Sequence, residues 1–486
     1  MTKNLSLDWS GTDAGRTSRV AISLPSGRQV TRGEFEAMVE AAARRLRRAG
    51  IEPGDVVVVA FDHAFRTLVI QLALARLGAA AAPESLPAEL SAALVAESPQ
   101  PEGRHPRILY VERTWFQPST DADAEAPVDA HGDPDATAVV LASSGTGGTA
   151  KSMAVSHARM AARLAIAERD VPIPPGARVL TTMGAFTGYG FTTLLRVLRA
   201  GATIVVEPGT GRTADTVVSE QVSYLVSAPG KITAILRAQP EGGGAHPSLR
   251  TIEFGGARMG EATVATIRAR LCDELRIVYG STEIGFVAGG VLPRGRAPEG
   301  WVGRVFDGVQ AQAVDETLAP MGAGRTGRLR LRGAGLVDGY LGDADATARN
   351  FRDGWFQTGD IASVSADHDL SLVGRADEVI NLGGNKVDPV LTEDALLSVP
   401  WVRDVAVFEV PGGNASRPPA IWAAVVTAAQ VDVAQLQAVV RERGGAAVPR
   451  YVMPVAEIPR NAGGKVMRER LVTLATEAMA KARTRR

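Results

Sequence analysis

The chain has 486 residues, of which 45% are hydrophobic and 22% charged, as in globular proteins of two or more domains. Lys plus Arg and Asp plus Glu both total 53, and this balance argues against a partner such as nucleic acid or an anionic membrane. The single cysteine, Cys272, excludes an internal disulfide and indicates a reducing, cytoplasmic environment. The first residues contain no apolar signal core, and the best apolar run, 68–82, is interrupted by Arg76 and too short to span a bilayer.

The first 300 residues alternate between helical and strand patterns. Thr31 to Glu34 reads as a capping box that opens a helix with an apolar stripe. A buried strand is expected at 56–60, followed by a helix at 64–77 that ends at Gly78. Further short apolar strands are expected at 108–111, 138–141, 203–206, 223–226, 251–254 and 275–278. This alternation predicts an α/β fold whose large N-terminal domain has parallel-rich, helix-covered sheets.

After about Gly300 the pattern changes. Glycine-rich turns separate short strands, such as 328–332 and 370–373, which predicts a small β-rich subdomain. The last part of the chain has its own alternation, with helices expected at 391–397 and 433–443 and strands at 402–410 and 421–426. We therefore predict an N-terminal domain over 1–376 and a small, mobile α+β C-terminal domain over 377–486.

A loop rich in small and hydroxyl residues follows the strand expected at 138–141. It reads Ser-Ser-Gly-Thr-Gly-Gly-Thr-Ala-Lys-Ser from Ser143 to Ser152. Small residues let backbone N–H groups close around an anion, and Lys151 adds a positive charge, as a triphosphate requires. Ala150 stands where a Walker A loop has its second glycine. The loop is therefore a degraded Walker A motif, another kind of phosphate loop, or a flexible polar loop.

The stretch Tyr279-Gly-Ser-Thr-Glu283 comes directly after the strand expected at 275–278. Ligands collect at the carboxyl ends of parallel strands. Tyr279 could stack on a base, Thr282 could bond a phosphate, and Glu283 could hold Mg²⁺, which prefers oxygen ligands. The alternative is an ordinary turn after a strand.

Two later stretches also carry polar groups beside glycines. The stretch 353–360 ends in Asp360, whose carboxylate could accept hydrogen bonds from both hydroxyls of a ribose, although an acid in a β-turn is common. Lys465 follows a glycine pair within 459–468, where a solvated side chain is the alternative.

Taken in order, these stretches resemble the adenylate-forming superfamily of acyl-CoA synthetases, adenylation domains of peptide synthetases and firefly luciferase. The similar stretches are 143–152, 254–257, 279–283, 300–303, 327–340, 350–361, 374–389 and 459–468. The resemblance implies ATP- and Mg²⁺-dependent conversion of a small carboxylic acid into an acyl-adenylate. It then implies transfer of the acyl group to a thiol, CoA or the arm of a separate carrier protein. An amine acceptor, a non-ligating nucleotide-binding relative and a P-loop NTPase are the alternatives.

The resemblance also implies a role for each matching residue. The ATP-binding residues would be Ser143, Ser144, Gly145, Thr146, Gly148, Lys151, Gly256, Ala257, Tyr279, Gly280, Ser281, Thr282, Asp360 and Arg375. The catalytic residues would be Lys465, Thr282 and Glu283, with Glu283 on the metal. The acid would lie against Phe186, Thr187, Tyr189, Gly256, Gly280 and Ile284. Asp377 would be the hinge, and Gly383 and Gly384 would line the thiol channel.

Three positions depart from the superfamily pattern. Gly147 replaces the usual hydroxyl residue of the phosphate loop, and Ala150 replaces its proline, so the loop is expected to be looser. Thr187 stands where many acyl-CoA synthetases have histidine, and no aspartate lies nearby to hold an amine. We therefore expect a mainly apolar acid, aryl or acyl, rather than an α-amino acid.

Overall fold

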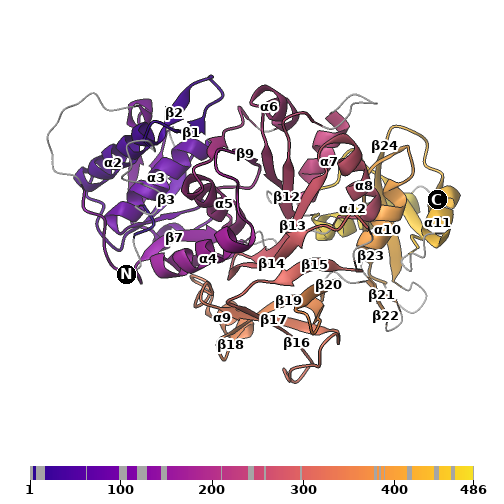
Figure 1. Ribbon diagram of the computed structural model, residues 1–486. Helices are drawn as coiled ribbons and strands as arrows, with labels where there is room; N and C mark the ends of the chain where they lie inside the picture. The colour runs from indigo at the N-terminus through magenta and orange to yellow at the C-terminus, as the bar shows by residue number, and fades with distance from the viewer. Residues whose placement is uncertain are drawn as a thin grey trace.

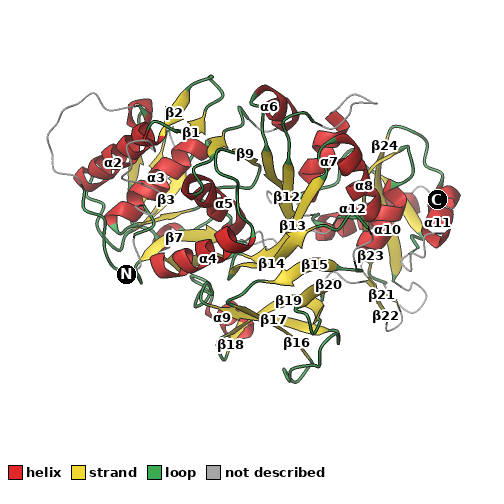
Figure 2. Ribbon diagram, viewed as in Figure 1, coloured by secondary structure: helices red, strands yellow, loops and turns green. Residues whose placement is uncertain are grey.

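The computed structural model describes residues 4–6, 17–61, 63–97, 105, 107–117, 128–143, 150–209, 211–238, 246–256, 259–295, 298–376, 380–382, 385–387, 389–412, 419–442, 448–460 and 466–484. Two sheets with helices around them form the N-terminal part, and a smaller sheet-and-helix lobe holds the C-terminus (Figures 1 and 2). The predicted α/β class, with a large N-terminal and a smaller C-terminal part, is confirmed.

The first sheet has six strands in the order β6-β5-β3-β4-β7-β8. They are β3 (Val56–Ala60), β4 (Ala80–Ala82), β5 (Ala93–Ala96), β6 (Ile108–Tyr110), β7 (Thr137–Ala142) and β8 (Ser152–Ser156). All neighbours run parallel except β7 and β8, which form an antiparallel pair. The strands predicted at 56–60, 108–111 and 138–141 are confirmed.

The second sheet begins as a parallel sheet behind the first. From its edge it contains β2 (Gln29–Thr31), β1 (Val20–Ser23), β10 (Thr203–Val205), β9 (Arg178–Thr181), β11 (Tyr224–Ser227), β12 (Thr251–Gly255) and β13 (Glu274–Ser281). Neighbours from β1 to β13 are parallel. Buried residues fill β11 and β12 completely, as expected for strands covered on both faces.

The same sheet continues past β13 with antiparallel strands. These are β14 (Gly285–Val291), β15 (Trp301–Val305), β20 (Asp369–Arg375), β19 (Trp355–Val364), β17 (Gly327–Gly333) and β16 (Val309–Val314), with β18 (Phe351–Arg352) paired to β19. The predicted β-rich region after Gly300 is therefore present, but its strands extend the main sheet to 14 strands.

Helices between the two sheets form the main core (Figure 2). They are α2 (Arg32–Arg48), α3 (Ala64–Leu77), α4 (His157–Asp170) and α5 (Gly188–Arg199). The capping box at Thr31 is confirmed, and Gly78 ends α3 at φ 78°, a conformation that glycine adopts at little cost. Arg76 is buried in α3 but pairs with Glu36 and Glu40 of α2, both at 2.6 Å.

A second set of helices covers the other face of β11–β13. It comprises α6 (Thr213–Ser219), α7 (Pro229–Ala238) and α8 (Glu261–Arg270), while α9 (Ala344–Asn350) lies beside β18 and β19. Cys272 is buried at the end of α8, and its thiol donates to the carbonyl of Arg250. Burial raises the pKa of Cys272 to about 11, which is typical of a core cysteine rather than a reactive thiol. Two short 3-10 turns complete this part of the chain, η1 (Ala88–Leu90) and η2 (Arg113–Phe116).

The C-terminal lobe is built on a three-stranded sheet. Its elements are β21 (Ile380–Leu382), β22 (Asn385–Val387), α10 (Pro389–Leu397), β23 (Val402–Val410), β24 (Ala420–Thr427), α11 (Val433–Glu442), β25 (Tyr451–Pro454) and α12 (Arg468–Thr484). Separate apolar clusters lie on the two faces of the sheet. The predicted boundary and hinge at Asp377 lie outside the described residues, so the division at 376/377 stays a prediction.

The C-terminal lobe contacts the N-terminal part at two glycines. A Cβ added at Gly260, before α8, would overlap the Asp394 carboxylate of α10. A Cβ added at Gly230, in α7, would lie 3.3 Å from Arg460 Nη1. Both contacts lie on the α7–α8 side of the large sheet, where the two lobes meet (Figure 1).

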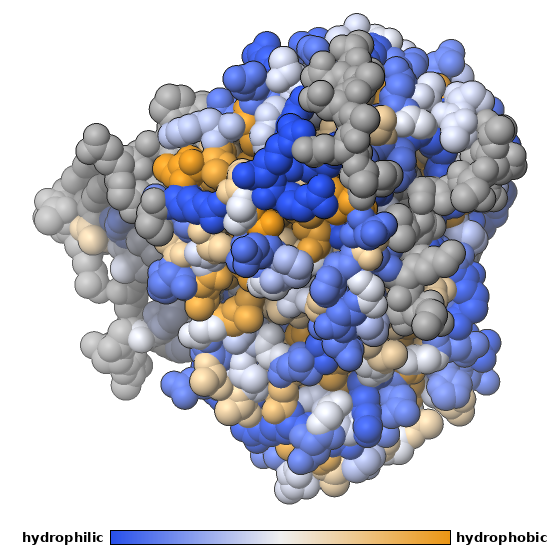
Figure 3. Space-filling view, turned by 90° about the vertical axis from the view of Figure 1, so that its left-hand side faces the viewer, coloured by the Kyte–Doolittle hydropathy of each residue, from blue (hydrophilic) through white to orange (hydrophobic). Residues whose placement is uncertain are grey.

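The N-terminal face mixes hydrophilic side chains with patches of apolar ones (Figure 3). Among its described residues, Tyr110 is 55% exposed and Leu90 38%. Within the described ranges, the structure contains no helix with the length and apolar character needed to cross a membrane.

Candidate functional site

The stretch Tyr279 to Glu283 forms the tip of a β-hairpin. Tyr279 to Ser281 lie within β13 rather than beyond it, and Ser281 pairs with Gly285 at the start of β14. A Cβ added at Gly280 would lie 2.3 Å from the Gly285 carbonyl oxygen, so only glycine allows this close pairing. The strand is longer than predicted because β14 returns alongside it, and Thr282 and Glu283 are presented at the turn.

Glu283 is 7% exposed and is held by a tyrosine that the sequence analysis left without a role. Tyr340 Oη donates to Glu283 Oε1 at 2.9 Å, and Asn350 Nδ2 donates to Tyr340 Oη at 3.2 Å. Burial and the charge of Glu283 raise the pKa of Tyr340, which keeps its hydroxyl protonated as a donor. Lys151 Nζ lies 4.5 Å from the centre of the Tyr340 ring, so the structure brings Lys151 and Glu283 to the two ends of one side chain.

Beneath the hairpin tip lies a buried cation, Arg163 of α4. Its Nη2 donates to the Glu283 carbonyl and its Nε to the Gly335 carbonyl, both at 2.9 Å. A Cβ at Gly285 would lie 2.9 Å from Arg163 Cγ, and one at Gly335 would lie 2.8 Å away. Burial lowers the pKa of Arg163 to about 10, so it remains charged at neutral pH. Sequence analysis missed this residue because an arginine in an amphipathic helix usually faces solvent.

Tyr279, Asp360 and Arg375 meet on the neighbouring part of the sheet. Asp360 and Arg375 are opposite each other in the β19–β20 ladder. Arg375 Nη1 lies 3.6 Å from Asp360 Oδ1, and Tyr279 Oη donates to Asp360 Oδ2 at 2.5 Å. Burial and the charge of Asp360 raise the pKa of Tyr279 well above its ordinary value. The carboxylate of Asp360 is thus oriented by two side chains from two other strands.

The proposed phosphate loop connects the antiparallel strands β7 and β8. Its base is closed by Ser143 N donating to the Lys151 carbonyl at 2.9 Å and by Lys151 N donating to Ser143 Oγ at 3.3 Å. A Walker A loop leads into a helix, whereas this loop leads into β8, and α4 begins only at His157. The degraded Walker A interpretation is therefore wrong. Ser144, Gly145, Thr146 and Gly148 lie outside the described residues.

The predicted acid-binding residues lie at the start of α5 and near the hairpin. Thr187 Oγ1 caps α5, accepting from Gly190 N at 3.0 Å and donating to the Gly184 carbonyl at 2.8 Å. A Cβ added at Gly188 would lie 3.1 Å from Thr282 Cα, so this helix start faces the hairpin tip. Ile284 is 3% exposed and packs in the apolar cluster that also contains Leu331 of β17.

Two further predicted positions lie at the same place. Phe186 is half-buried, and its carbonyl accepts from Ala142 N at 3.0 Å, which ties the start of α5 to the end of β7. Gly256 follows β12 with φ 83°, a conformation that favours glycine. The start of α5 and the end of β12 therefore enclose the region where the acid was predicted.

Several predicted site residues fall outside the described residues. They are Lys465, Ala257, Asp377, Gly383 and Gly384. The segment that carries Lys465 is closed by an antiparallel bridge between Arg460 and Val466. Because Arg460 lies against Gly230, this bridge is positioned beside α7, which follows the carboxyl end of β11.

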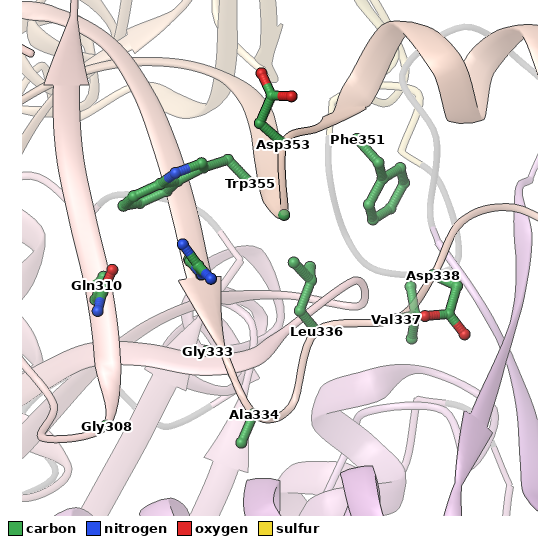
Figure 4. A pocket seen from close by; sticks show the side chains of 12 residues that line it. Gly308, Gln310, Gly333, Ala334, Leu336, Val337, Asp338, Phe351, Asp353 and Trp355 are labelled. Atoms are coloured by element: carbon green, nitrogen blue, oxygen red, sulfur yellow. The ribbon is translucent and has the colours of Figure 1, made fainter. Parts of the chain in front are cut away.

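A cavity of about 490 Å³ lies apart from these groups. Figure 4 shows Gln310 and Trp355 on one side of it and Phe351, Leu336 and Asp338 on the other. None of the predicted site residues lines this cavity. Val337 is its link to the hairpin, because the Val337 N–H donates to the Glu283 carbonyl at 3.0 Å.

Comparisons with known proteins agree with this geometry. Residues 11–341 match the AMP-binding enzyme family and residues 391–465 match the AMP-binding enzyme C-terminal domain. The chain is 29% identical over 470 residues to 4-coumarate–CoA ligase-like 6 of Oryza sativa subsp. japonica, covering 87% of this chain and 78% of that protein.

Two solved structures share the fold. ATP-bound MatB from Rhodopseudomonas palustris superposes with a TM-score of 0.84 at 22% identity, covering 98% of this chain and 99% of that one. The amide bond synthetase McbA from Marinactinospora thermotolerans has a TM-score of 0.79 at 26% identity, covering 97% and 99%. The predicted resemblance is confirmed, and the chain belongs to the AMP-binding enzyme family, within the adenylate-forming superfamily.

Proposed function

We propose that this chain activates a carboxylic acid with ATP as an acyl-adenylate and then transfers the acyl group to a thiol, with CoA as the favoured acceptor. The family supports the broader statement, an ATP-using, AMP-forming ligase. The observation that carries the proposal is the pair of clusters on adjoining strands. One cluster is Lys151, Tyr340 and Glu283, and the other is Tyr279 with Asp360 and Arg375.

The first step requires one anion to attack another. An oxygen of the carboxylate forms a bond to the α-phosphorus, the bond from that phosphorus to the β-phosphate oxygen breaks, and pyrophosphate leaves. Lys151 at the base of the loop would neutralise the leaving phosphates, and the Thr282 hydroxyl would donate to the α-phosphate. Lys465 would bridge the carboxylate and the α-phosphate. Fixed cations and donors of this kind act most strongly on charge that shifts in the transition state.

The ribose and adenine would occupy the second cluster. Asp360 offers carboxylate oxygens to the ribose hydroxyls, and Arg375 and Tyr279 fix its orientation. The face of Tyr279 would stack on the base, with Gly256 opposite. Because the Tyr279 hydroxyl is already bonded to Asp360, the base and sugar positions are coupled through one side chain.

The residues present fit a magnesium ion. Glu283 offers a hard carboxylate oxygen, and Tyr340 bonds its Oε1 and fixes its direction. No group of three His, Cys, Asp or Glu side chains that could form a metal site occurs among the described residues. The ion would therefore take its other ligands from phosphate oxygens and water, as Mg²⁺ commonly does, and would supply positive charge at the phosphates.

The acceptor separates two candidate functions. The similarity to a 4-coumarate–CoA ligase-like protein favours CoA. The 26% identity to an amide bond synthetase over nearly the whole chain favours an amine as the second candidate. Transfer to either acceptor breaks the bond between the acyl carbon and the AMP oxygen, so both leave AMP.

A panel of carboxylic acids assayed for pyrophosphate and AMP release tests the proposal, with CoA, an amine or neither present. We expect acid-dependent AMP and pyrophosphate, and an acyl product only with the true acceptor. Lys465→Ala should abolish acid-dependent pyrophosphate exchange while ATP binding persists. Formation of ADP, or exchange unchanged in Lys465→Ala, would contradict the mechanism.

A further inference from the structure

We propose that a buried ion pair between Glu253 and Arg196 closes the inner end of the acid pocket and selects carboxylic acids whose far end carries no charge. This inference rests on the proposed function, because it assigns a substrate class to the same site.

Tyr189 connects the pocket to the ion pair. Its ring packs on the backbone at the end of β12, where a Cβ added at Gly255 would lie 3.1 Å from Tyr189 Cε1. The ring also meets Phe286 edge to face, with centroids 5.4 Å apart. Phe286 follows the turn that carries Glu283. The partly exposed Tyr189 ring therefore lies between the strand end leading to Gly256 and the hairpin, where the tail of the acid would point.

The ion pair itself is sealed and complete on its acidic side. Arg196 and Glu253 side chains are 1% and 0% exposed. Each carboxylate oxygen of Glu253 accepts one guanidinium N–H at 3.0 Å and one tyrosine O–H, from Tyr189 at 2.9 Å and from Tyr224 at 2.5 Å. Burial raises the pKa of Glu253, but Arg196 and these hydrogen bonds outweigh it and leave the pKa lowered, so the carboxylate is ionised.

Three contacts fix the position of the guanidinium. It holds Glu253 in two hydrogen bonds, donates to the Val171 carbonyl, and lies over the Phe286 ring at 5.2 Å. The same Phe286 touches Tyr189, so the pair and the pocket wall share two aromatic rings. A change of charge in the pair would therefore act directly on the end of the pocket.

The charge balance of the pair decides which acid fits. Glu253 and Arg196 neutralise each other, so the inner end presents aromatic surface without net charge. A second carboxylate on the substrate would lose its hydration beside Glu253, and Arg196 has both terminal nitrogens already engaged. A cationic tail would meet the opposite difficulty, because both oxygens of Glu253 are already occupied. The site therefore fits an uncharged aryl or short acyl acid.

The test compares acids matched in shape but differing in charge at the far end: benzoate with terephthalate, cinnamate with 4-carboxycinnamate, and butyrate with succinate. Acid-dependent pyrophosphate release gives kcat/KM for each acid. We expect the wild-type chain to favour the neutral member of an accepted pair on the order of a hundredfold, since the second charge would be buried unpaired. A wild-type chain that uses the dicarboxylate equally well overturns the inference.

Two variants assign the selectivity to the ion pair. Glu253→Gln keeps the side-chain volume but leaves Arg196 as a buried unpaired cation, so the preference for the neutral acid should fall about tenfold or more. The double variant Glu253→Gln, Arg196→Gln is neutral again and should return to rejecting the dicarboxylate. Glu220→Gln is the matched control, because Glu220 pairs with Arg178 at the outer part of the sheet, and its selectivity should equal the wild type.

The outcomes separate this inference from the proposed function. If no acid gives pyrophosphate with the wild-type chain, the proposed function fails. If neutral acids react but Glu253→Gln, folded by its Tm and by ATP binding, keeps the wild-type selectivity, only the ion-pair inference fails. If Glu253→Gln does not fold, the double variant decides: a loss of selectivity in that neutral variant contradicts the inference.

Discussion

Two buried carboxylates on neighbouring strands, Glu253 of β12 and Glu283 at the β13–β14 turn, have opposite surroundings. Glu253 receives four hydrogen bonds and a bidentate arginine. Glu283 receives one tyrosine hydroxyl on Oε1, and the nearby Arg163 binds its backbone carbonyl instead of its carboxylate. A fully paired carboxylate shapes a site, whereas a carboxylate held by one neutral donor can still take a cation. The comparison therefore separates a residue for selectivity from a residue for chemistry.

The largest expected effect tests the closed member of this comparison. Arg196→Met removes the cation and leaves Glu253 buried without a counter-charge, which should lower the free energy of unfolding by about 3–5 kcal/mol. Urea denaturation measures this loss. Replacing both residues by Met should recover most of the stability, because a buried pair is often no more stabilising than apolar packing. A single variant as stable as the wild type would show that the pair is not tightly coupled.

The open member should show the reverse behaviour. Glu283→Gln keeps an oxygen that can accept from Tyr340, so its Tm should stay near that of the wild type. Acid-dependent pyrophosphate release should fall on the order of a hundredfold, because one charged ligand of the proposed Mg²⁺ is lost. Asp338→Asn is a suitable control, since the Asp338 side chain is 84% exposed. Full activity of Glu283→Gln over a range of Mg²⁺ concentrations would remove Glu283 from the metal site.

A pH effect is expected beneath the hairpin support, at the first residue of α4. Burial lowers the pKa of His157 to about 4, and its Nδ1 accepts from Leu5 N at 3.1 Å. The unfolded chain binds this proton near its ordinary pKa of 6.5. Stability should therefore be full above about pH 6.5 and fall towards pH 4, by at most about 3 kcal/mol.

The variant His157→Asn isolates this contribution. It removes the titrating group and keeps an acceptor near the Leu5 N–H, so the fall in stability between pH 6.5 and 4 should become shallower. Urea denaturation at several pH values measures the two slopes. Equal slopes in the two proteins would show that His157 titrates alike when folded and unfolded.

The smallest effect concerns the nucleotide cluster. Tyr279→Phe keeps the ring but removes the hydroxyl that donates to Asp360, and one such bond to a charged group contributes about 1.5–3 kcal/mol. We expect KM for ATP to rise roughly tenfold while kcat changes little. Thr358 lies beside this cluster and donates from its hydroxyl to the Leu329 carbonyl. A fall in kcat without a change in KM would indicate that Tyr279 acts on the reacting atoms instead.

The sequence predicted those features that short patterns specify. The capping box at Thr31, the glycine end of α3 and the central strands follow from local periodicity, and the structure confirms them. Glu253 and Arg196 were missed because they lie 57 residues apart, and each reads as one charge within an apolar strand or helix. Tyr340 was missed because its hydroxyl acquires a function only when β13 and the segment before α9 meet.

Turn geometry was the other source of error. The loop after Ser143 was compared with a Walker A loop because both are rich in small residues, and the antiparallel return of β8 is not visible in that composition. Likewise, β13 extends through Tyr279 to Ser281 because Gly280 allows β14 to approach its backbone. In both cases the pairing strand, and not the local residue types, determined the structure.

The measurement that tests the central claim most directly uses a carboxylic acid labelled with ¹⁸O in both carboxylate oxygens. The acid should be one that supports pyrophosphate release, incubated with ATP, Mg²⁺ and the acceptor, and the nucleotide product should be analysed by mass spectrometry. If the carboxylate attacks the α-phosphorus, AMP will carry one labelled oxygen and pyrophosphate none. Label in inorganic phosphate with ADP as the nucleotide, or AMP without label, would contradict the account.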